Sequence, residues 1–132
     1  LTLGKTLMTE QRPLTEAEQL VQQQLDAYNS KNIEAWLGCY APDAVQLDFH
    51  GAVLANGHDQ MRERIRLRFN EPDLHAQLLN RMVMGEWVTD HELIQRNFPQ
   101  GRGQVEMLCL YQVKQGLIVK ALFQLGQPEL FE

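Results

Sequence analysis

The sequence predicts an α+β fold in which three helices pack on one face of a curved antiparallel sheet. Helical spacing of apolar residues dominates the chain up to Phe69, whereas alternation of apolar and polar residues dominates from His75 onward. Short turn sequences separate the later runs, and strands joined by short turns pair antiparallel. Because helices come first and strands follow, the order favours α+β layers over an alternating α/β fold.

The first two helices precede a strand hairpin. Thr15 and Glu18 form a capping box, and the helix that follows carries an apolar stripe interrupted by the polar Gln24, which needs a partner or a role. A short second helix is predicted after Asn32, ended by Pro42, which cannot sustain the helical hydrogen bonds. Its shared face consists of Ile33, Trp36, Leu37 and Tyr40.

A third helix is predicted from about His58 to Phe69, with Met61, Ile65 and Phe69 inward. It carries four arginines among acidic residues: Arg62, Arg64, Arg66 and Arg68. We interpret this run as a solvated outward face rather than a phosphate-binding stripe.

Six strands complete the prediction. A hairpin through His50–Gly51 joins Ala44–Phe49 to Ala52–Leu54. The later strands are His75–Trp87, Glu92–Phe98, Gln104–Lys114 and Leu117–Leu125, separated by turns at Thr89–Asp90, Pro99–Gly103 and Gln115–Gly116.

Length, charge and cysteine usage bound the class of protein. The 132 residues suffice for one domain, predicted over 14–132 after a flexible N-terminal tail over 1–13. A net charge of −5 argues against nucleic acid as a partner, which requires a basic face. No apolar run approaches the roughly 18 residues of a membrane span, and no signal-peptide core opens the chain, so we expect no membrane partner and a cytoplasmic protein. Two cysteines and four scattered histidines favour neither a disulfide framework nor a metal site.

A curved sheet with helices on its concave side leaves a cavity at its wide end. Strand alternation places one set of apolar residues inward: Val105, Met107, Cys109 and Tyr111, then Ala121, Phe123 and Leu125. With Tyr28, Trp36 and Tyr40 from the preceding segments, they would line an apolar, aromatic pocket. The same residues would also suit a plain hydrophobic core.

Asp48 and His50 are the candidate catalytic residues. They lie two apart on a predicted strand, so they share a face and are close enough to couple as an acid–base pair. The alternative is that this face meets solvent at the hairpin tip. Arg96 and Arg81 lie on strands that alternation alone cannot orient: inward, Arg96 could hold an anionic substrate; outward, it would belong to the sheet surface or a dimer contact.

The segments Asn32–Trp36, Tyr40–Asp48 and Asn56–Met61 resemble the nuclear transport factor 2-like superfamily, specifically its ketosteroid isomerase-like and SnoaL-like (polyketide cyclase-like) branch. The resemblance covers nearly the whole chain after Thr15. It implies a cone-shaped domain around a pocket and a homodimer formed through the outer face of the sheet. The superfamily includes isomerases, cyclases, dehydratases, epoxide hydrolases and binding modules, so the resemblance does not select one activity.

The resemblance assigns roles to four residues. Asp48 matches the general base of the isomerases, and Tyr40 matches a tyrosine that supports their hydrogen-bond network. Gln24 and Cys109 occupy the positions of two oxyanion donors, a tyrosine and a protonated aspartate. Because loss of one such donor typically costs about 2.7–4 kcal/mol, efficient steroid isomerisation is not expected.

Two functions therefore stay open. The first is a cofactor-free isomerase, lyase or cyclase that transfers a proton on a small hydrophobic carbonyl compound. Asp48 and His50 would be catalytic, and the substrate would contact Gln24, Tyr28, Trp36, Tyr40, Met107, Cys109, Tyr111, Phe123 and Leu125. The second is a non-catalytic module that binds a small ligand or a partner protein. Replacement of Asp48 by Asn would separate the two.

Overall fold

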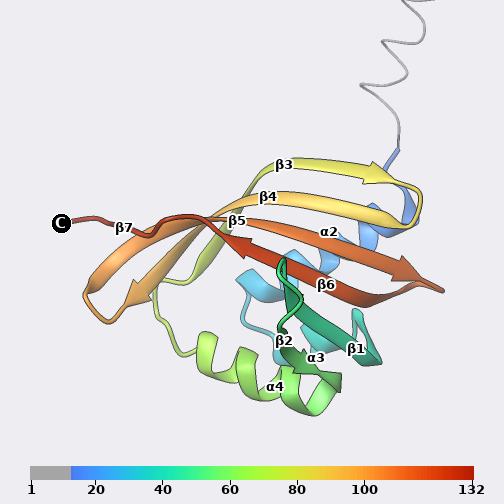
Figure 1. The fold of residues 1–132 in the computed structure, drawn as a ribbon, viewed down its shortest axis with the longest axis horizontal. Coiled ribbons are helices and arrows are strands. Elements are labelled where there is room, and N and C mark those ends of the chain that lie inside the picture. Colours follow the sequence, from blue (N-terminus) through green and yellow to red (C-terminus); the bar gives the residue numbers. More distant parts are fainter. Residues whose placement is uncertain (1–12) are drawn as a thin grey trace, which may run out of the picture.

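The computed structural model describes residues 13–132, so the predicted flexible tail falls, apart from Pro13, outside the described residues. This part of the chain forms three helices and a seven-stranded sheet (Figure 1). The helices are α2 (Glu16–Asn29), α3 (Ile33–Leu37) and α4 (Gly57–Arg68). The strands are β1 (Tyr40–Asp48), β2 (Val53–Asn56), β3 (His75–Met84), β4 (Trp87–Phe98), β5 (Gly101–Lys114), β6 (Leu117–Leu125) and β7 (Glu129–Leu130).

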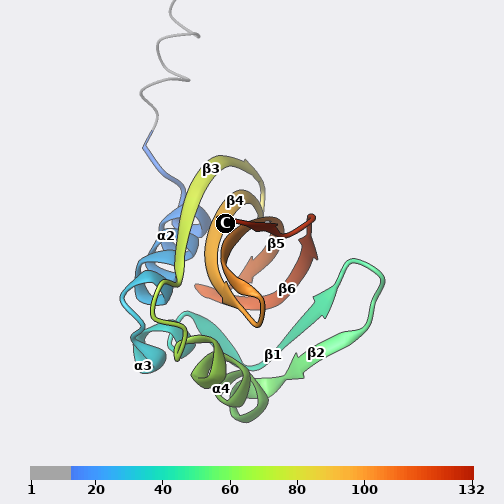
Figure 2. The same cartoon turned by 90° about the vertical axis from the view of Figure 1, so that its left-hand side faces the viewer.

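The sheet runs in the order β2-β1-β6-β5-β4-β3, with β7 paired to β5. Every pairing along it is antiparallel except that of β1 with β6, which is parallel, so the sheet is mixed rather than wholly antiparallel as predicted. Figure 2 shows the strands curving without closing, with the helices along one side. No helix in the described part of the chain is long and apolar enough to cross a membrane.

The predicted capping box is confirmed at the start of α2. The Thr15 hydroxyl accepts a hydrogen bond from the Glu18 amide at 3.1 Å, and the Glu18 carboxylate accepts one from the Thr15 amide at 3.0 Å. These two bonds satisfy amides that the first helical turn leaves without partners. Behind the cap, Val21 and Leu25 are buried against the sheet side of the domain.

The second helix is shorter than predicted. It ends at Leu37, and Tyr40 is the first residue of β1 rather than part of the helical face. Pro42 lies inside β1, in the stretch where pairing to β6 is interrupted between Tyr40 and Val45. A proline is tolerated there because that stretch of strand needs no ladder hydrogen bond from its nitrogen.

The turn predicted at Thr89–Asp90 is wrong. β3 ends at Met84 and β4 begins at Trp87, with Gly85 in the left-handed region at φ +59°. Asp90 lies within β4, paired in register with Arg81 of β3. Its carboxylate is buried in an ion pair across the two strands, which explains why an acidic residue stands in mid-strand.

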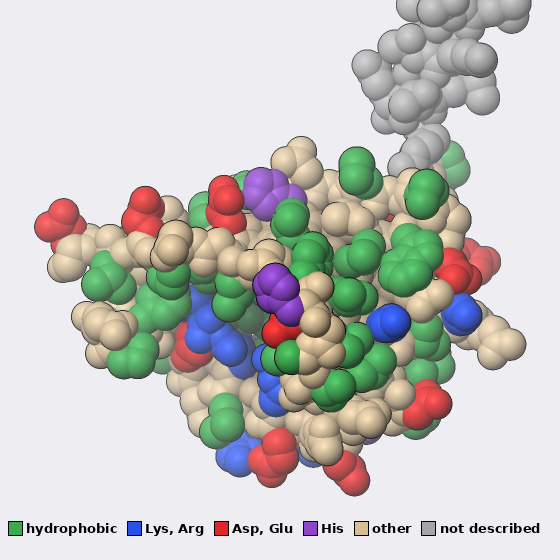
Figure 3. Space-filling model, viewed as in Figure 1, with side chains coloured by type: hydrophobic (Ala, Val, Ile, Leu, Met, Phe, Trp, Pro, Cys, Tyr) green, Lys and Arg blue, Asp and Glu red, His purple; other side chains and the backbone are tan. Residues whose placement is uncertain are grey.

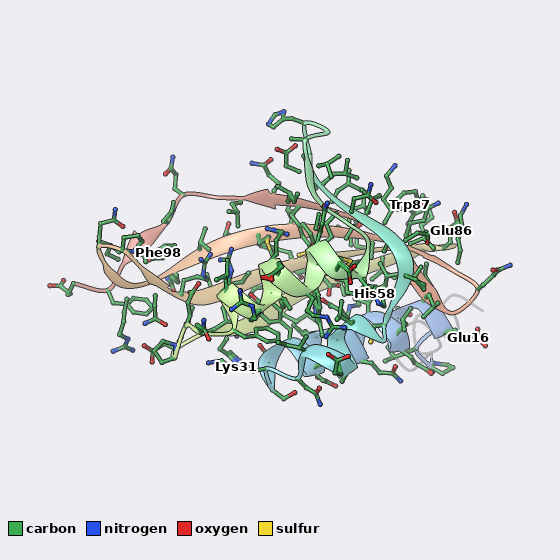
Figure 4. The ribbon with its side chains drawn as sticks, turned by 90° about the horizontal axis from the view of Figure 1, so that it is seen from below. Glu16, Lys31, His58, Glu86, Trp87 and Phe98 are labelled. Carbon is green, nitrogen blue, oxygen red and sulfur yellow. The ribbon has the colours of Figure 1, made fainter. Side chains whose placement is uncertain are left out.

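The inward face of α4 agrees with the prediction, since Met61, Ile65 and Phe69 are all buried. Seen from below, α4 lies across the concave side of the strands, with His58 in its first turn (Figure 4). The His58 Nε2 lies 2.9 Å from the Tyr40 carbonyl oxygen, which ties the helix to the start of β1. The core therefore lies between the concave face of the sheet and the three helices.

Candidate functional site

A cavity of about 400 Å³ opens between the helices and the concave face of the sheet. Side chains from α2, α3, α4, β1, β4, β5 and β6 line it. Of the residues singled out as catalytic or substrate-binding, all but Cys109 are among its lining residues: Gln24, Tyr28, Trp36, Tyr40, Asp48, His50, Met107, Tyr111, Phe123 and Leu125. Cys109 is fully buried instead. The volume suits a ligand the size of a small bicyclic molecule.

Gln24 organises the aromatic wall of the cavity. Its Oε1 accepts hydrogen bonds from the Trp36 indole at 3.0 Å and from the Tyr40 hydroxyl at 3.2 Å. Its Nε2 donates to the Val21 carbonyl at 3.4 Å, within α2 itself. The amide therefore faces the wall as an acceptor, and its geometry holds two aromatic side chains rather than presenting a donor to a ligand.

Asp48 organises the hairpin between β1 and β2. Its Oδ1 accepts hydrogen bonds from the backbone amides of His50 at 2.8 Å and Ala52 at 3.0 Å. These bonds form an Asx-type turn, in which a side-chain carboxylate replaces a backbone acceptor. His50 is exposed, and its bond to Asp48 comes from the backbone rather than the imidazole. Both side chains lie at the edge of the cavity.

Glu92 is a cavity residue that the sequence interpretation missed. It is only 3% exposed, and its Oε2 has no hydrogen-bond partner among the described residues. Burial raises the pKa of Glu92 from 4.5 to about 7. The Asp90 carboxylate adds to the increase, whereas the Cys109 thiol and the Arg81 guanidinium act against it. The carboxyl can therefore accept or donate a proton near neutral pH.

The two acidic residues on the inward face of β4, Asp90 and Glu92, differ in their partners. Asp90 is held by Arg81 through two hydrogen bonds, from Nε at 2.6 Å and from Nη2 at 2.8 Å. Arg81 also donates to Gln22 of α2 at 2.9 Å, which ties β3 to the helix. This pair answers the question left open for Arg81: its donors are used within the fold. Glu92 has no such cation bonded to it among the described residues.

Three tyrosine side chains line the cavity together with Glu92. Burial raises the pKa values of Tyr28, Tyr40 and Tyr111 above their ordinary range, so all three stay protonated near neutral pH. Tyr40 is committed to Gln24, whereas the Tyr28 hydroxyl donates no hydrogen bond to any described residue. Tyr28 is therefore a donor available to a ligand in the cavity.

The sequence predicted that all four arginines of α4 face solvent, but two of them also reach the cavity. Arg64 and Arg68 line the cavity, and Arg96 of β4 joins them there. Arg62 and Arg66 are exposed and pair with Glu34 and Glu63, and Arg64, although it reaches the cavity, is also exposed. The reason is the helical period: residues four apart share a face, so alternate arginines divide between two faces.

Figure 3 shows Lys and Arg side chains gathered in a hollow between the strands and the lower helix, with hydrophobic side chains around them. Among the described residues, no group of three His, Cys, Asp or Glu side chains is placed to hold a metal ion.

Strand alternation would have identified Glu92 had the turn before β4 been placed at Gly85. With that turn, Val88, Asp90, Glu92, Ile94 and Arg96 share the inward face. The misplaced turn at Thr89–Asp90 broke this series into two parts.

Comparison of the sequence with models of known protein families identifies its family. Residues 21–121 match the SnoaL-like domain family. None of the curated proteins matches the sequence.

Several solved structures have the same fold. An NTF2-like protein of unknown function from Burkholderia pseudomallei is 15% identical, with a TM-score of 0.75 over 86% of this chain and 92% of that one. IdmH from Streptomyces antibioticus, a proposed polyketide cyclase, is 18% identical, with a TM-score of 0.73 over 84% and 92%. A protein with a ketosteroid isomerase-like fold from Catenulispora acidiphila, in complex with trimethylamine, is 17% identical, with a TM-score of 0.69 over 80% and 83%. At these identities the similarity establishes the fold.

Proposed function

Because the chain belongs to the SnoaL-like domain family, we propose that it is a cofactor-free enzyme that transfers a proton on a small hydrophobic carbonyl compound. The observation that carries the proposal is Glu92, a buried carboxyl that lines the cavity with one oxygen free of partners among the described residues. A buried polar atom without a partner has a desolvation cost that a bound substrate would relieve.

Glu92 would remove the proton from the α-carbon next to the carbonyl and return it to that carbon, or to the γ-carbon where the substrate has a β,γ double bond. Its pKa of about 7 suits both steps, because a base and its conjugate acid are then both populated near neutral pH. Tyr28 would donate a hydrogen bond to the carbonyl oxygen as negative charge develops there. Tyr28 and Glu92 are close enough for the carboxylate to raise the pKa of the hydroxyl.

The aromatic wall supports a substrate with an apolar ring. Trp36 and Tyr40 pack with their ring centroids 4.8 Å apart, and Tyr111 and Phe123 with theirs 6.3 Å apart. Such surfaces exclude water and strengthen electrostatic interactions with the reacting atoms.

Asp48 remains the alternative base, since it also lines the cavity. Its Oδ1 is occupied by two amides, which favours a structural contribution to the hairpin. The two candidate bases differ in burial: Glu92 is buried, whereas Asp48 is half-buried beside an exposed turn.

Exchange of the α-protons of 2-tetralone in D₂O, followed by NMR, tests the proposal without requiring the natural substrate. We expect Glu92→Gln to lower protein-catalysed exchange by about 100-fold or more. Tyr28→Phe should lower it by about 100-fold, the typical loss for one oxyanion donor. Asp48→Asn should retain most activity, because an asparagine oxygen still accepts the hairpin amides.

The matched carboxyl variants give opposite outcomes under the two assignments. Loss of exchange in Asp48→Asn with full activity in Glu92→Gln would move the base to Asp48. If the wild-type protein binds 2-tetralone but does not catalyse exchange, the second function, a non-catalytic ligand-binding module, is favoured.

We further propose that the chain forms a homodimer through the outer face of the sheet. Large apolar side chains are exposed on β3, with Met82 at 70% and Met84 at 77%. An exposed apolar patch of this kind favours a protein partner. Light scattering of the wild type and of a Met82→Lys, Met84→Lys variant tests this: a dimeric mass in the first and a monomeric mass in the second is the expected result.

A further inference from the structure

Three arginines line one side of the cavity. Arg64 and Arg68 project from neighbouring turns of α4, and Arg96 projects from β4. Most other cavity residues are apolar or aromatic, although the carboxyls of Asp48 and Glu92 also line it. The chain as a whole has a net charge of −5. A concentration of positive charge inside the cavity of an acidic protein therefore needs an explanation.

One acidic residue, Glu71, serves this cluster. Its two oxygens accept hydrogen bonds from Arg96, at 2.7 Å from Nε and 3.0 Å from Nη2, and its Oε1 also accepts one from the Asn97 amide at 2.9 Å. Glu71 Oε2 lies 3.8 Å from Arg68 Nη1, which is beyond hydrogen-bond distance. The carboxylate is thus committed to Arg96.

Among the described residues, Arg64 has no carboxylate partner, and Arg68 has only the long ion pair to Glu71, whose two oxygens Arg96 already binds. Arg64 donates to the neutral amide oxygen of Gln46 at 3.0 Å. Arg68 donates no hydrogen bond to any described residue, although its side chain is only 30% exposed. Desolvation beside the cavity lowers the pKa values of both, and the neighbouring arginine in each case lowers them further, whereas Tyr28 acts on both, and Glu71 on Arg68, in the opposite direction. Because the two adjacent guanidinium groups repel each other, a bound anion would stabilise them.

We propose that the substrate carries a carboxylate, and that Arg64 and Arg68 hold this group in the cavity. The proposal rests on the proposed function in that it names the substrate class for the same site: an apolar oxo acid rather than a neutral ketone. Arg96 already binds a carboxylate through paired donors, that of Glu71. The guanidinium donors of Arg64 and Arg68 suit the same planar group.

Tyr28 connects the arginine cluster to the proposed proton-transfer group. The charges of Arg68 and Arg96 lower its pKa, whereas that of Glu92 raises it, so the phenol lies within electrostatic range of both. An oxo acid bound by its carboxylate at the arginines would place its apolar body against the aromatic wall and its carbonyl towards Tyr28 and Glu92. The cluster would then fix the orientation of the substrate.

Binding of 2-naphthoate and of its neutral analogue 2-naphthamide, measured by calorimetry on the full chain, tests the proposal. At low salt, we expect naphthoate to bind at least tenfold more tightly than naphthamide. This preference should shrink as salt is raised, because counterions screen the interaction. Arg64→Met and Arg68→Met should each weaken naphthoate binding about tenfold and leave naphthamide binding unchanged.

Arg66→Met is the matched control. It removes one positive charge from the same helix, at a position that is paired with Glu63 and does not line the cavity. It should keep the preference for naphthoate. Equal binding of the two probes, absence of naphthoate binding at millimolar concentration, or the same loss in Arg66→Met as in Arg68→Met would each overturn the proposal.

The 2-tetralone exchange assay tests the proposed function separately from the arginine cluster. Exchange of 2-tetralone needs no carboxylate on the ligand, and Glu92→Gln should lower it by about 100-fold or more without removing naphthoate binding. Loss of the naphthoate preference alone refutes the arginine clamp. Unchanged exchange in Glu92→Gln alone refutes the proton-transfer assignment.

Discussion

Replacement of Glu92 by Gln should change how the stability of the protein depends on pH. Burial raises the pKa of Glu92 from 4.5 to about 7, so between these values the folded protein holds a proton that the unfolded chain has released. Stability from this residue is therefore fully present below about pH 4.5, falls as pH rises towards 7, and is lost above the folded-state pKa. Gln has no proton to lose, so the variant should lack this decline.

The magnitude follows from the difference between the two pKa values. Each pKa unit corresponds to about 1.4 kcal/mol, so the wild type should lose roughly 3 kcal/mol from this residue between pH 4.5 and 8. For a domain of this size the loss corresponds to a fall of about 10 °C in Tm. The buried side-chain amide that Glu92→Gln introduces carries its own desolvation cost, but that cost is the same at every pH.

Urea unfolding at intervals between pH 4.5 and 8 measures the slope directly. The groups that act on Glu92 are Asp90 on its own strand, Cys109 on β5 and Arg81 on β3, and all are unchanged in the variant. Glu106→Gln, which removes an exposed carboxyl from β5, is the matched control and should keep the wild-type slope. If wild type and Glu92→Gln show the same pH profile, Glu92 does not titrate near 7 and its proposed role as a base fails.

Three further changes test the fold around the cavity. Gly103→Ala should release β7 from β5, because a Cβ at this position would contact the Glu129 carbonyl oxygen; we expect a loss of about 1–3 kcal/mol and faster amide exchange in the C-terminal strand. Asp90→Asn should destabilise the protein by about 3–5 kcal/mol in urea unfolding, since it leaves the guanidinium of a buried ion pair uncompensated. Gln24→Leu should cost about 1–3 kcal/mol for each of two buried donors left without an acceptor, visible as a lower Tm and an altered tryptophan emission.

The sequence predicted correctly those elements whose ends are marked by nearby capping or turn residues. The capping box at Thr15 fixed the start of α2, and the Gln115–Gly116 turn between β5 and β6 was placed correctly. Alternation correctly oriented the penultimate strand, with Val105, Cys109 and Tyr111 buried. In each case the signal lies within a few residues of the feature it predicts.

The remaining features depend on long-range contacts. Asp90 resembles a turn residue in sequence, and only its partner on β3 makes it acceptable in mid-strand. Tyr40 continues the apolar spacing of α3, yet it opens β1 because that segment pairs with β6, far along the chain. The parallel pairing of β1 with β6 likewise joins segments whose sequences carry no mark of it. Glu92 was missed because the turn misplaced at Thr89–Asp90 interrupted the alternation of β4, and its lack of a partner among the described residues is visible only in the folded structure.

The arginine cluster and Glu92 should be coupled through any anion bound between them. Deprotonated Glu92 repels a carboxylate in the same cavity, so naphthoate affinity should fall as pH rises through about 7. By linkage, bound naphthoate must raise the pKa of Glu92 by the corresponding factor. Asp48 and His50 also line the cavity and carry titratable groups, so the wild-type profile alone does not identify the residue responsible. Naphthoate binding in Glu92→Gln isolates it: a profile that becomes flat between pH 6 and 8 assigns the coupling to Glu92, and an unchanged profile assigns it to the mouth of the cavity and separates the two halves of the site.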